Sequence, residues 1–378
     1  MNLFRGKKQE AFHGMLGVDL GPSGVKIVEL TPEKGKMRLS TYGYSEYAEP
    51  KPEAMAFLDD VDKTVEAITR IVKESGMKAT KAIAALPSAM VFQAIITIPQ
   101  PKNVKEDLKA LIETQAAKLL PLPLSEMILD SNVLDKDLLP KEEERGKKKE
   151  ESMSQQPTDE ARKNKNIRVL ITGAPKTLVG KYVEIFRRSK IELVSLETEV
   201  FALIRSLVGN DKSRIMLVDM GHVQTNIAIV DRGVPYLHRS TRGGGVDVTN
   251  ALAQSTSMAF ADAERMKCDL GLQQGGGEPP KLVQTALANI VHELRYAIEL
   301  YAAQDFHSNT TVEKIIMTGG SAHLPALDTY LTSQLNVNVY IGDPWARIAA
   351  PPSLRPVLEE VGPRFAVALG LAMRQNES

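Results

Sequence analysis

Two segments of this chain, the second 200 residues after the first, follow the same pattern. Residues 15–21 and 215–221 are short apolar runs that end in Asp-x-Gly, and small or polar residues follow each of them. A second apolar run then begins, at 25–30 in one case and at 226–230 in the other. Such runs, rich in β-branched residues and divided by glycine, are typical of two strands joined by a tight turn. The repeat therefore predicts two related α/β lobes, each beginning with a strand–turn–strand unit.

Helical and strand patterns alternate along the rest of the chain. Helical spacing of apolar residues covers 61–75, 103–120 and 178–189. It also covers the stretch that begins after the Gly- and Pro-rich break at 273–280 and ends at Tyr301. A further helix is expected over about 325–334. Strand-like runs cover 82–99, 167–172 and 315–318. The helix at 103–120 is expected to be capped at Asn103 and to end before Pro121.

Composition excludes several classes of protein. Lys plus Arg and Asp plus Glu both total 47, so no global charge favours nucleic acid or anionic lipid. A single cysteine, Cys268, excludes an internal disulfide framework and suits a reducing compartment. No window approaches the roughly 20 apolar residues that a membrane span requires. Charged and polar residues dominate 141–166, where we expect a flexible surface loop.

The sequence lacks the signatures of several other nucleotide-binding and catalytic sites. No G-x-x-x-x-G-K-[ST] loop is present, and no G-x-G-x-x-G with an acidic residue about 20 positions later follows the first strand. Six histidines and one cysteine give no zinc-binding spacing, and no G-x-S-x-G elbow occurs.

The two Asp-x-Gly turns have the chemistry of a phosphate site. Small residues let backbone N–H groups approach phosphate oxygens, and a carboxylate stands directly before each turn. Because Mg²⁺ prefers few protein carboxylates together with water and phosphate oxygens, one aspartate from each lobe suits a Mg-nucleotide in the cleft between them. The predicted residues are Asp19, Gly21, Ser23, Gly24 and Lys26 in the first lobe and Asp219, Gly221, Gln224 and Thr225 in the second, with Asp19 and Asp219 as the metal ligands.

Two further glycine-rich elements strengthen this interpretation. Gly244 and Gly245 open an expected helix and would offer free N–H groups at its N-terminus. Gly319, Gly320 and Ser321 stand between an expected strand and helix. Each element alone is more often ordinary turn chemistry than a binding site, but four of them in one chain favour nucleotide binding.

The order of these motifs resembles the actin-like ATPase superfamily, which has a bilobed, ribonuclease H-like α/β fold. Residues 19–26 and 219–225 look like its two phosphate motifs and 315–321 like its adenosine motif. The resemblance implies that Glu264 and Lys267 contact the ribose and base. Within the superfamily, 17–30, 86–88, 120–124 and 244–249 are most similar to the PilM family of type IV pilus assembly proteins, related to FtsA.

The resemblance also implies a division of the chain. It gives a first-lobe core at 14–80, an extra FtsA/PilM-type subdomain at 81–192 that contains the insertion 141–166, and a link with the second phosphate motif at 193–247. A smaller second-lobe subdomain follows at 248–311. The second-lobe core at 312–378 is expected to end in a helix that returns to the first lobe.

The function implied by the resemblance is that of a cytoplasmic scaffold. It would bind ATP and Mg²⁺ and dock the cytoplasmic N-terminal peptide of an inner-membrane PilN-type protein in a groove beside the extra subdomain, in a nucleotide-sensitive way. Other pilus-assembly proteins and further copies of the chain are additional partners, in a pathway that drives twitching motility. No nucleic acid and no direct membrane span are expected, so the protein would reach the inner membrane through its partner.

Hydrolysis is expected to be slow at most. Pro22 and Gly24 replace small hydroxyl residues of the family, and His222-Val223 replaces the small pair in the second turn. Superfamily members orient the attacking water with a Glu or Gln, and Glu199 aligns best with that position. The alternative interpretation of Glu199 is a helix-start glutamate favoured by the helix dipole.

Two other functions remain open from the sequence. An FtsA- or MreB-like filament-forming ATPase has the same fold, although 364–378 resembles a packed helix with a polar tail rather than an amphipathic membrane anchor. A small-molecule kinase of this fold would need a catalytic aspartate in a substrate pocket, and the sequence identifies none.

Overall fold

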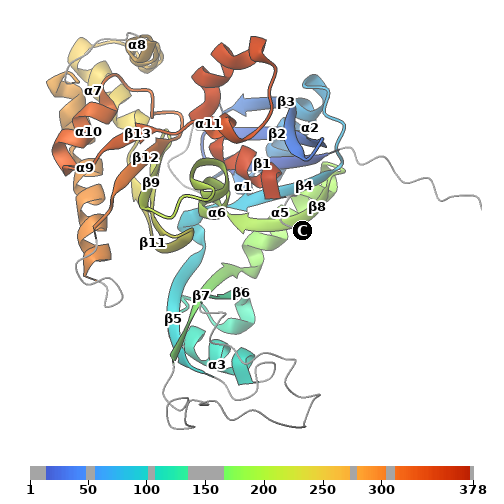
Figure 1. Cartoon of the computed structure of the whole chain (residues 1–378). Helices are drawn as coiled ribbons and strands as arrows, with labels where there is room; N and C mark the ends of the chain where they lie inside the picture. The colour runs from blue at the N-terminus through green and yellow to red at the C-terminus, as the bar shows by residue number, and fades with distance from the viewer. Residues whose placement is uncertain are drawn as a thin grey trace, which may run out of the picture. The chain divides into compact units, whose positions relative to one another are not determined.

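The fold is known from a computed structural model, which describes residues 14–47, 56–100, 107–134, 166–272, 279–303 and 311–374. The chain divides into two compact units (Figure 1). Met1–Ala89 together with Lys181–Ser378 form the first unit, and Met90–Gly180 form the second. Among the described residues, none of the helices has the length and apolar character needed to cross a bilayer.

The first unit contains two five-stranded sheets with the same arrangement. In each sheet the first three strands along the chain are antiparallel neighbours in sequence order. Two later strands extend the sheet on the other side of the first strand and run parallel to it. The first sheet, in the order β3-β2-β1-β4-β8, consists of β1 (Met15–Gly21), β2 (Gly24–Glu33), β3 (Lys36–Glu46), β4 (Lys81–Leu86) and β8 (Glu192–Thr198). The second, in the order β11-β10-β9-β12-β13, consists of β9 (Arg214–Met220), β10 (Gln224–Asp231), β11 (Val234–Arg242), β12 (Lys314–Thr318) and β13 (Val339–Ile341).

The predicted repeat extends beyond the first hairpin of each sheet. The β2–β3 pairing shifts register between Glu29 and Leu30, and the β10–β11 pairing shifts between Ile229 and Val230. The turns that follow, 34–35 and 232–233, each place a basic residue and a glycine at positive φ. Two-residue hairpin turns with both residues at positive φ match the twist of the strands, and glycine suits the second position. The two lobes thus share their irregularities as well as their strand order.

Helices cover both sheets, and most agree with the sequence-based expectation. They are α1 (Ala56–Asp59), α2 (Val61–Glu74), α5 (Lys176–Arg188), α6 (Glu199–Leu203), α7 (Gly245–Thr256), α8 (Phe260–Leu272), α9 (Lys281–Ala302), α10 (Leu327–Leu335) and α11 (Arg355–Met373). Ile204–Val208 continues α6 as a π-helix. Short 3₁₀ segments lie at Ser88–Met90, Leu124–Glu126, Pro344–Arg347 and Pro352–Leu354.

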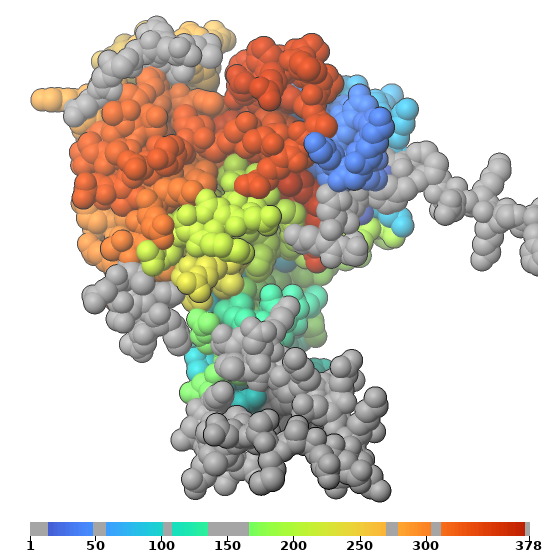
Figure 2. All heavy atoms as spheres, in the orientation of Figure 1, coloured from blue at the N-terminus to red at the C-terminus, as the bar shows by residue number. Residues whose placement is uncertain are grey.

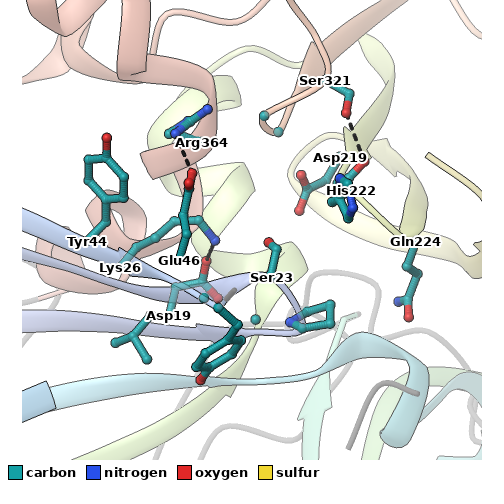
Figure 3. A pocket seen from close by; sticks show the side chains of 18 of the residues that line it. Asp19, Ser23, Lys26, Tyr44, Glu46, Asp219, His222, Gln224, Ser321 and Arg364 are labelled. Carbon is teal, nitrogen blue, oxygen red and sulfur yellow. Dashed lines mark hydrogen bonds and ion pairs between the residues drawn. The ribbon is translucent and has the colours of Figure 1, made fainter. Parts of the chain in front are cut away.

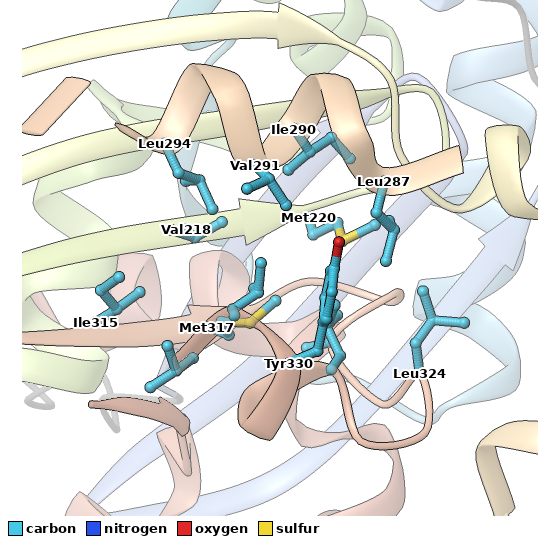
Figure 4. Close-up of a cluster of buried hydrophobic side chains, with 14 of the residues drawn as sticks. Val218, Met220, Leu287, Ile290, Val291, Leu294, Ile315, Met317, Leu324 and Tyr330 are labelled. Carbon is cyan, nitrogen blue, oxygen red and sulfur yellow. The ribbon is translucent and has the colours of Figure 1, made fainter. Parts of the chain in front are cut away.

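The core of the second lobe lies between its sheet and the long helix α9 (Figure 4). Leu287, Ile290 and Leu294 lie on one face of α9 at helical spacing, and all three are buried. They pack in one cluster with Val218 of β9 and Met317 of β12. The alternate residues on β9, Ile215 and Leu217, are buried in a different cluster, so side chains cover both faces of this strand.

The C-terminal helix α11 packs against the first sheet (Figure 2). Its Phe365, Ala368 and Leu369 pack with Val28 and Leu30 of β2. The approach is close: a Cβ at Gly17 in β1 would lie 1.9 Å from the carbonyl oxygen of Ala368. Glycine at this position therefore lets a helix backbone touch a strand.

A second core joins the two lobes inside the first unit. It contains Ile83 of β4 and Val200 of α6, together with Leu217 of β9 and Ala366 of α11. Trp345 lies elsewhere, in the core between α11 and the first sheet, where its Nε1 donates to the carbonyl oxygen of Leu358 at 2.7 Å. Trp345 is therefore a packing residue of this core.

The described part of the second unit contains a three-stranded antiparallel sheet, β5-β7-β6, and the helix α3. Its elements are β5 (Phe92–Pro99), α3 (Asp107–Ala116), β6 (Met127–Val133) and β7 (Asn166–Pro175). Ile98, Ile112 and Ile171 belong to its core. The cap predicted at Asn103 and all of the insertion 141–166 except Asn166 lie outside the described residues.

Two boundaries differ from the sequence-based expectation. The strand-like run 82–99 is two strands, because β4 pairs with β1 and β8 in the first sheet whereas β5 pairs with β7. The compact unit at 90–180 is also narrower than the extra subdomain expected at 81–192. The difference arises because β4 and the second half of α5 belong to the first unit.

Candidate functional site

A cavity of about 430 Å³ lies in the first unit, and both lobes line it (Figure 3). The lining residues come from the turns after β1, β9 and β12, from strands β2, β3 and β10, and from helices α6, α8 and α11. The sequence-predicted residues that line it are Asp19, Gly21, Ser23, Gly24, Lys26, Glu199, Asp219, Gly221, Gln224, Glu264, Lys267, Gly319, Gly320 and Ser321. The structure therefore brings together residues from motifs separated by as many as 300 positions.

In the first lobe, Asp19 already has a cationic partner. Strand register places Lys26 directly opposite Asp19, and its Nζ lies 3.0 Å from Asp19 Oδ2. Burial alone would lower the pKa of Lys26, but the ion pair with Asp19 prevails and raises it. Both side chains are largely buried, so the pair is a fixed part of the pocket wall.

In the second lobe, Asp219 has no such partner. The position opposite Asp219 in the strand register is occupied by Asn226, which corresponds to Lys26 in the repeat. Within the described residues, no hydrogen bond or ion pair to the Asp219 carboxylate is present. Burial, together with the charge of Asp19, raises the pKa of Asp219 to about 6. The charge of Lys26 opposes this shift without direct contact, so within the described residues the site holds an acidic group that has no directly bonded cation.

Glu199, at the first position of α6, is held in place by two donors. Its Oε2 accepts hydrogen bonds from the backbone N–H of Ser88 at 3.1 Å and from the side-chain amide of Asn226 at 3.0 Å. Burial, followed by the charges of Asp19 and Asp219, raises the pKa of Glu199 to about 8. At neutral pH the protonated carboxyl group is therefore favoured, and it is a weak acceptor for the proton of a water molecule.

Asn226 is also the centre of a polar chain across the second sheet. Its Oδ1 accepts hydrogen bonds from Gln224 Nε2 and from Ser240 Oγ, both at 2.7 Å. Because side chains alternate along a strand, Gln224 and Asn226 face the cavity and Thr225 faces the other side. Thr225 is fully buried and donates to the carbonyl oxygen of Gly243 at 2.9 Å. The predicted ligand contact of Thr225 is thus replaced by a structural one.

The start of α7 does not offer free N–H groups, contrary to the sequence-based expectation. The N–H of Gly245 donates to the carbonyl oxygen of Gly221 at 3.0 Å, and the N–H of Val246 donates to the carbonyl oxygen of His222 at 2.8 Å. The N–H of Gly244 donates to the carboxylate of Asp247. Gly244 and Gly245 do not line the cavity. These glycines instead allow α7 to pack on the second turn, because a Cβ at Gly244 would lie 2.3 Å from Gly221 O.

Lys267 and Glu264 connect α8 to α7. Lys267 Nζ donates to Glu264 Oε2 at 2.7 Å, to Thr249 Oγ1 at 3.0 Å and to the carbonyl oxygen of Gly245 at 3.2 Å. Burial opposes ionisation of Glu264, but the hydrogen bonds from Lys267 and Thr249 lower its pKa. Lys267 is almost fully buried, so its charge is committed to this network although its surface reaches the cavity.

Several lining residues were not found from the sequence. Glu46 and Tyr44 of β3, Asn226 of β10, Phe260 of α8 and Arg364 of α11 all border the cavity. Asn226 could have been identified, because it stands 200 positions after Lys26. The others carry no local motif, and only the packing of β3, α8 and α11 around the cavity brings them to the site.

The arrangement suits an anionic ligand bound together with a cation. An ionised Asp219 beside the Asp19–Lys26 pair leaves a negative charge that a divalent ion can neutralise. Among the described residues, no group of three or more His, Cys, Asp or Glu side chains forms a metal site. Mg²⁺ commonly binds one or two protein carboxylates and completes its coordination with water and phosphate oxygens, which suits such a site.

Comparison with known proteins agrees with the fold and the motifs. The family model described as "Type IV pilus assembly protein PilM" matches residues 17–145 and 155–376. The fold is similar to a solved "PilM-PilN type IV pilus biogenesis complex", with 23% identity, a TM-score of 0.77, and coverage of 97% of this chain and 100% of that chain.

More distant structures share the same architecture. MreB5 of Spiroplasma citri bound to AMPPNP has 11% identity, a TM-score of 0.53 and 96% coverage of both chains. EutJ from Carboxydothermus hydrogenoformans has 14% identity, a TM-score of 0.50, and coverage of 95% of this chain and 88% of that one. The predicted actin-like fold is confirmed. Because the family model matches almost the whole length, the chain belongs to the family of the type IV pilus assembly protein PilM.

Proposed function

We propose that this protein binds ATP with Mg²⁺ in the cavity between its lobes. The observation that carries the proposal is the unpartnered Asp219 carboxylate, which faces the same cavity as the Asp19–Lys26 pair and two glycine-rich turns. Asp219 would be the principal protein ligand of the metal ion. Lys26 would remain paired with Asp19 and present positive charge to a phosphate. When bound, Mg²⁺ would supply charge neutralisation between Asp219 and the phosphate oxygens.

The other lining residues would hold the nucleotide without taking part in chemistry. The first turn, at Gly21, Ser23 and Gly24, lets the chain approach a phosphate closely. Gly319 and Gly320 would do the same for the nucleoside, and Glu264 lies on the neighbouring wall. The similarity to an MreB that was solved with AMPPNP supports a nucleotide in a fold of this kind.

The ATP-bound protein would act as an assembly scaffold at the inner membrane. Family membership supports a role in type IV pilus assembly, and the similar solved complex contains PilM together with PilN. We therefore propose that the chain docks the cytoplasmic N-terminal peptide of a PilN-type inner-membrane protein. A cytoplasmic location beside that membrane follows from the proposed partner.

Nucleotide sensitivity would pass through Glu199. Its Oε2 accepts from the N–H of Ser88, and Ser88 stands two residues before the second unit begins at Met90. A ligand that changes the charge around Asp19 and Asp219 also acts on Glu199, because both charges already shift its pKa. The backbone that enters the second unit is thereby bonded to a side chain of the nucleotide site.

Hydrolysis would be slow because Glu199 is a poor base in this arrangement. Its pKa of about 8 favours the protonated form, and its Oε2 is occupied by two donors. Glu199 would thus position Ser88 and Asn226 and contribute little to activation of water.

The direct test is ATP titration by calorimetry, with Mg²⁺ and with EDTA, on the full chain. Asp219→Asn should weaken the Mg²⁺-dependent part of binding by at least about tenfold, since it removes a charged ligand oxygen. Asp262→Asn is the matched control, because Asp262 is exposed on α8 and does not line the cavity. If the wild-type chain does not bind ATP, the nucleotide proposal is wrong.

The partner is tested separately with a fluorescent PilN N-terminal peptide. Anisotropy should report binding, with an affinity that changes when ATP and Mg²⁺ are added. Absence of peptide binding in both states would contradict the scaffold proposal. Sedimentation of the chain on addition of ATP would instead favour a filament-forming protein.

A further inference from the structure

Arg364 lies at the rim of the cavity, fixed between the two lobes. It follows Pro363 inside α11, and the carbonyl oxygen of Pro363 accepts hydrogen bonds from the N–H of Gly319 at 3.0 Å and from Thr318 Oγ1 at 2.7 Å. A Cβ on Gly320 would lie 3.9 Å from the Arg364 guanidinium. The backbone next to Arg364 is thus tied to the turn after β12, and its side chain borders the cavity.

The present partner of Arg364 is a weak one. Arg364 Nη1 lies 3.0 Å from Glu46 Oε1, and the guanidinium lies 5.6 Å from the ring centroid of Tyr44 (Figure 3). The two charged side chains are 32% and 65% exposed. Ion pairs this exposed contribute little to stability, so Arg364 can exchange Glu46 for a better anion at small cost.

The other cationic side chains that line the cavity are less available. Lys26 is paired with Asp19 in a largely buried contact. Lys267 is bound to Glu264, Thr249 and Gly245 and is almost fully buried. Arg364 is therefore the lining cation that can be redirected without breaking a buried network.

We propose that Arg364 binds the phosphate chain of the nucleotide, and that Glu46 competes with the phosphates for it. The proposal rests on nucleotide binding in this cavity. A guanidinium group donates in a planar fork that matches phosphate oxygens, and such charge-assisted contacts are among the stronger hydrogen bonds. The charge of a triphosphate exceeds that of one Mg²⁺ ion, so a further cation at the rim has a clear electrostatic function.

The experiment compares ATP with adenosine as calorimetric probes in the presence of Mg²⁺. Arg364→Ala should weaken ATP binding about tenfold, the value of one charge-assisted hydrogen bond, and should change adenosine binding by less than about twofold. Arg364→Lys should lie between Arg364→Ala and the wild type, because it keeps the charge and loses the fork. Arg355→Ala, at an exposed position at the start of the same helix, is the matched control and should bind as the wild type does.

The substitution Glu46→Gln should change ATP affinity in the opposite direction from Arg364→Ala. Removing the competitor should strengthen ATP binding about two- to fivefold, the range of an exposed ion pair, and a folding defect cannot mimic a gain in affinity. Equal losses for ATP and adenosine in Arg364→Ala would place the arginine on the nucleoside and overturn the proposal. Unchanged ATP affinity in both variants would also overturn it while leaving nucleotide binding intact. A wild-type chain that binds neither probe would instead refute the nucleotide site itself.

Discussion

The substitution Asn226→Lys tests which aspartate serves the metal ion. Asn226 stands opposite Asp219 as Lys26 stands opposite Asp19, so a lysine at 226 can reproduce the first-lobe ion pair in the second lobe. In the first-lobe pair, Lys26 Nζ lies 3.0 Å from Asp19 Oδ2. Asp219 at present has a pKa of about 6 rather than 3.8, so its environment disfavours the carboxylate by roughly 3 kcal/mol relative to an ordinary aspartate.

A cation beside Asp219 would offset this cost of the ionised form. Opposite charges about 4 Å apart interact by roughly 4 kcal/mol at an effective dielectric constant of about 20. The gain is reduced because the substitution also removes the amide that donates to Glu199 and accepts from Gln224 and Ser240. We expect the remaining effect to lower the Mg²⁺-dependent part of ATP affinity at least about tenfold, since lysine and Mg²⁺ would compete for one carboxylate.

Calorimetric titration of ATP with Mg²⁺ and with EDTA measures this difference directly. Asn226→Ala is the matched control, because it removes the same amide contacts and adds no charge. In Asn226→Ala the Mg²⁺ dependence should remain close to that of the wild type. If Asn226→Lys and Asn226→Ala respond to Mg²⁺ equally, Asp219 is not the principal ligand and the reasoning from the repeat is refuted.

Two further predictions concern stability. The melting temperature of the nucleotide-free chain should fall as pH rises from about 4.5 to about 8. Over this range native Glu199, with its pKa of about 8, keeps a proton that the unfolded chain has released, so folding becomes less favourable as pH rises. The substitution Glu199→Gln should make this fall in melting temperature smaller. In urea denaturation, Gly370→Ala should cost about 2 kcal/mol or more, since its Cβ would lie 1.9 Å from the carbonyl oxygen of Ala202. Gly180→Ala, also in a helix but with no atom within 4 Å of its Cβ, should gain about 0.5–1 kcal/mol.

The two-lobed fold could be predicted from the sequence because each copy of the repeat specifies which strands pair with each other. An apolar run, a turn of small residues and a second apolar run specify a hairpin locally, and two such hairpins at equal spacing specify two similar sheets. The same logic located Asp19 and Asp219, because residues at strand ends are positioned by the strand itself. These assignments required no knowledge of long-range packing.

Features that depend on packing between distant segments were harder to predict. Whether the N–H groups of Gly245 and Val246 are free depends on what lies against them, and the carbonyl oxygens of Gly221 and His222 accept from both. The run 82–99 is uniformly strand-like, yet its halves belong to different sheets, and composition does not mark the division. Arg364 reaches the cavity only because α11 returns to the first lobe.

Two of the candidate residues outside the repeated hairpins, Glu199 and Arg364, lie on helices that touch each other. Residues of α6 and α11 share the core that joins the lobes, and the backbone of α11 at Gly370 approaches Ala202 of α6 so closely that no side chain fits between them. A change in the angle between the lobes must therefore move α6 and α11 together. Because α6 carries the bond to Ser88 and α11 carries the pair with Glu46, a ligand that draws the lobes together would act on both contacts at once.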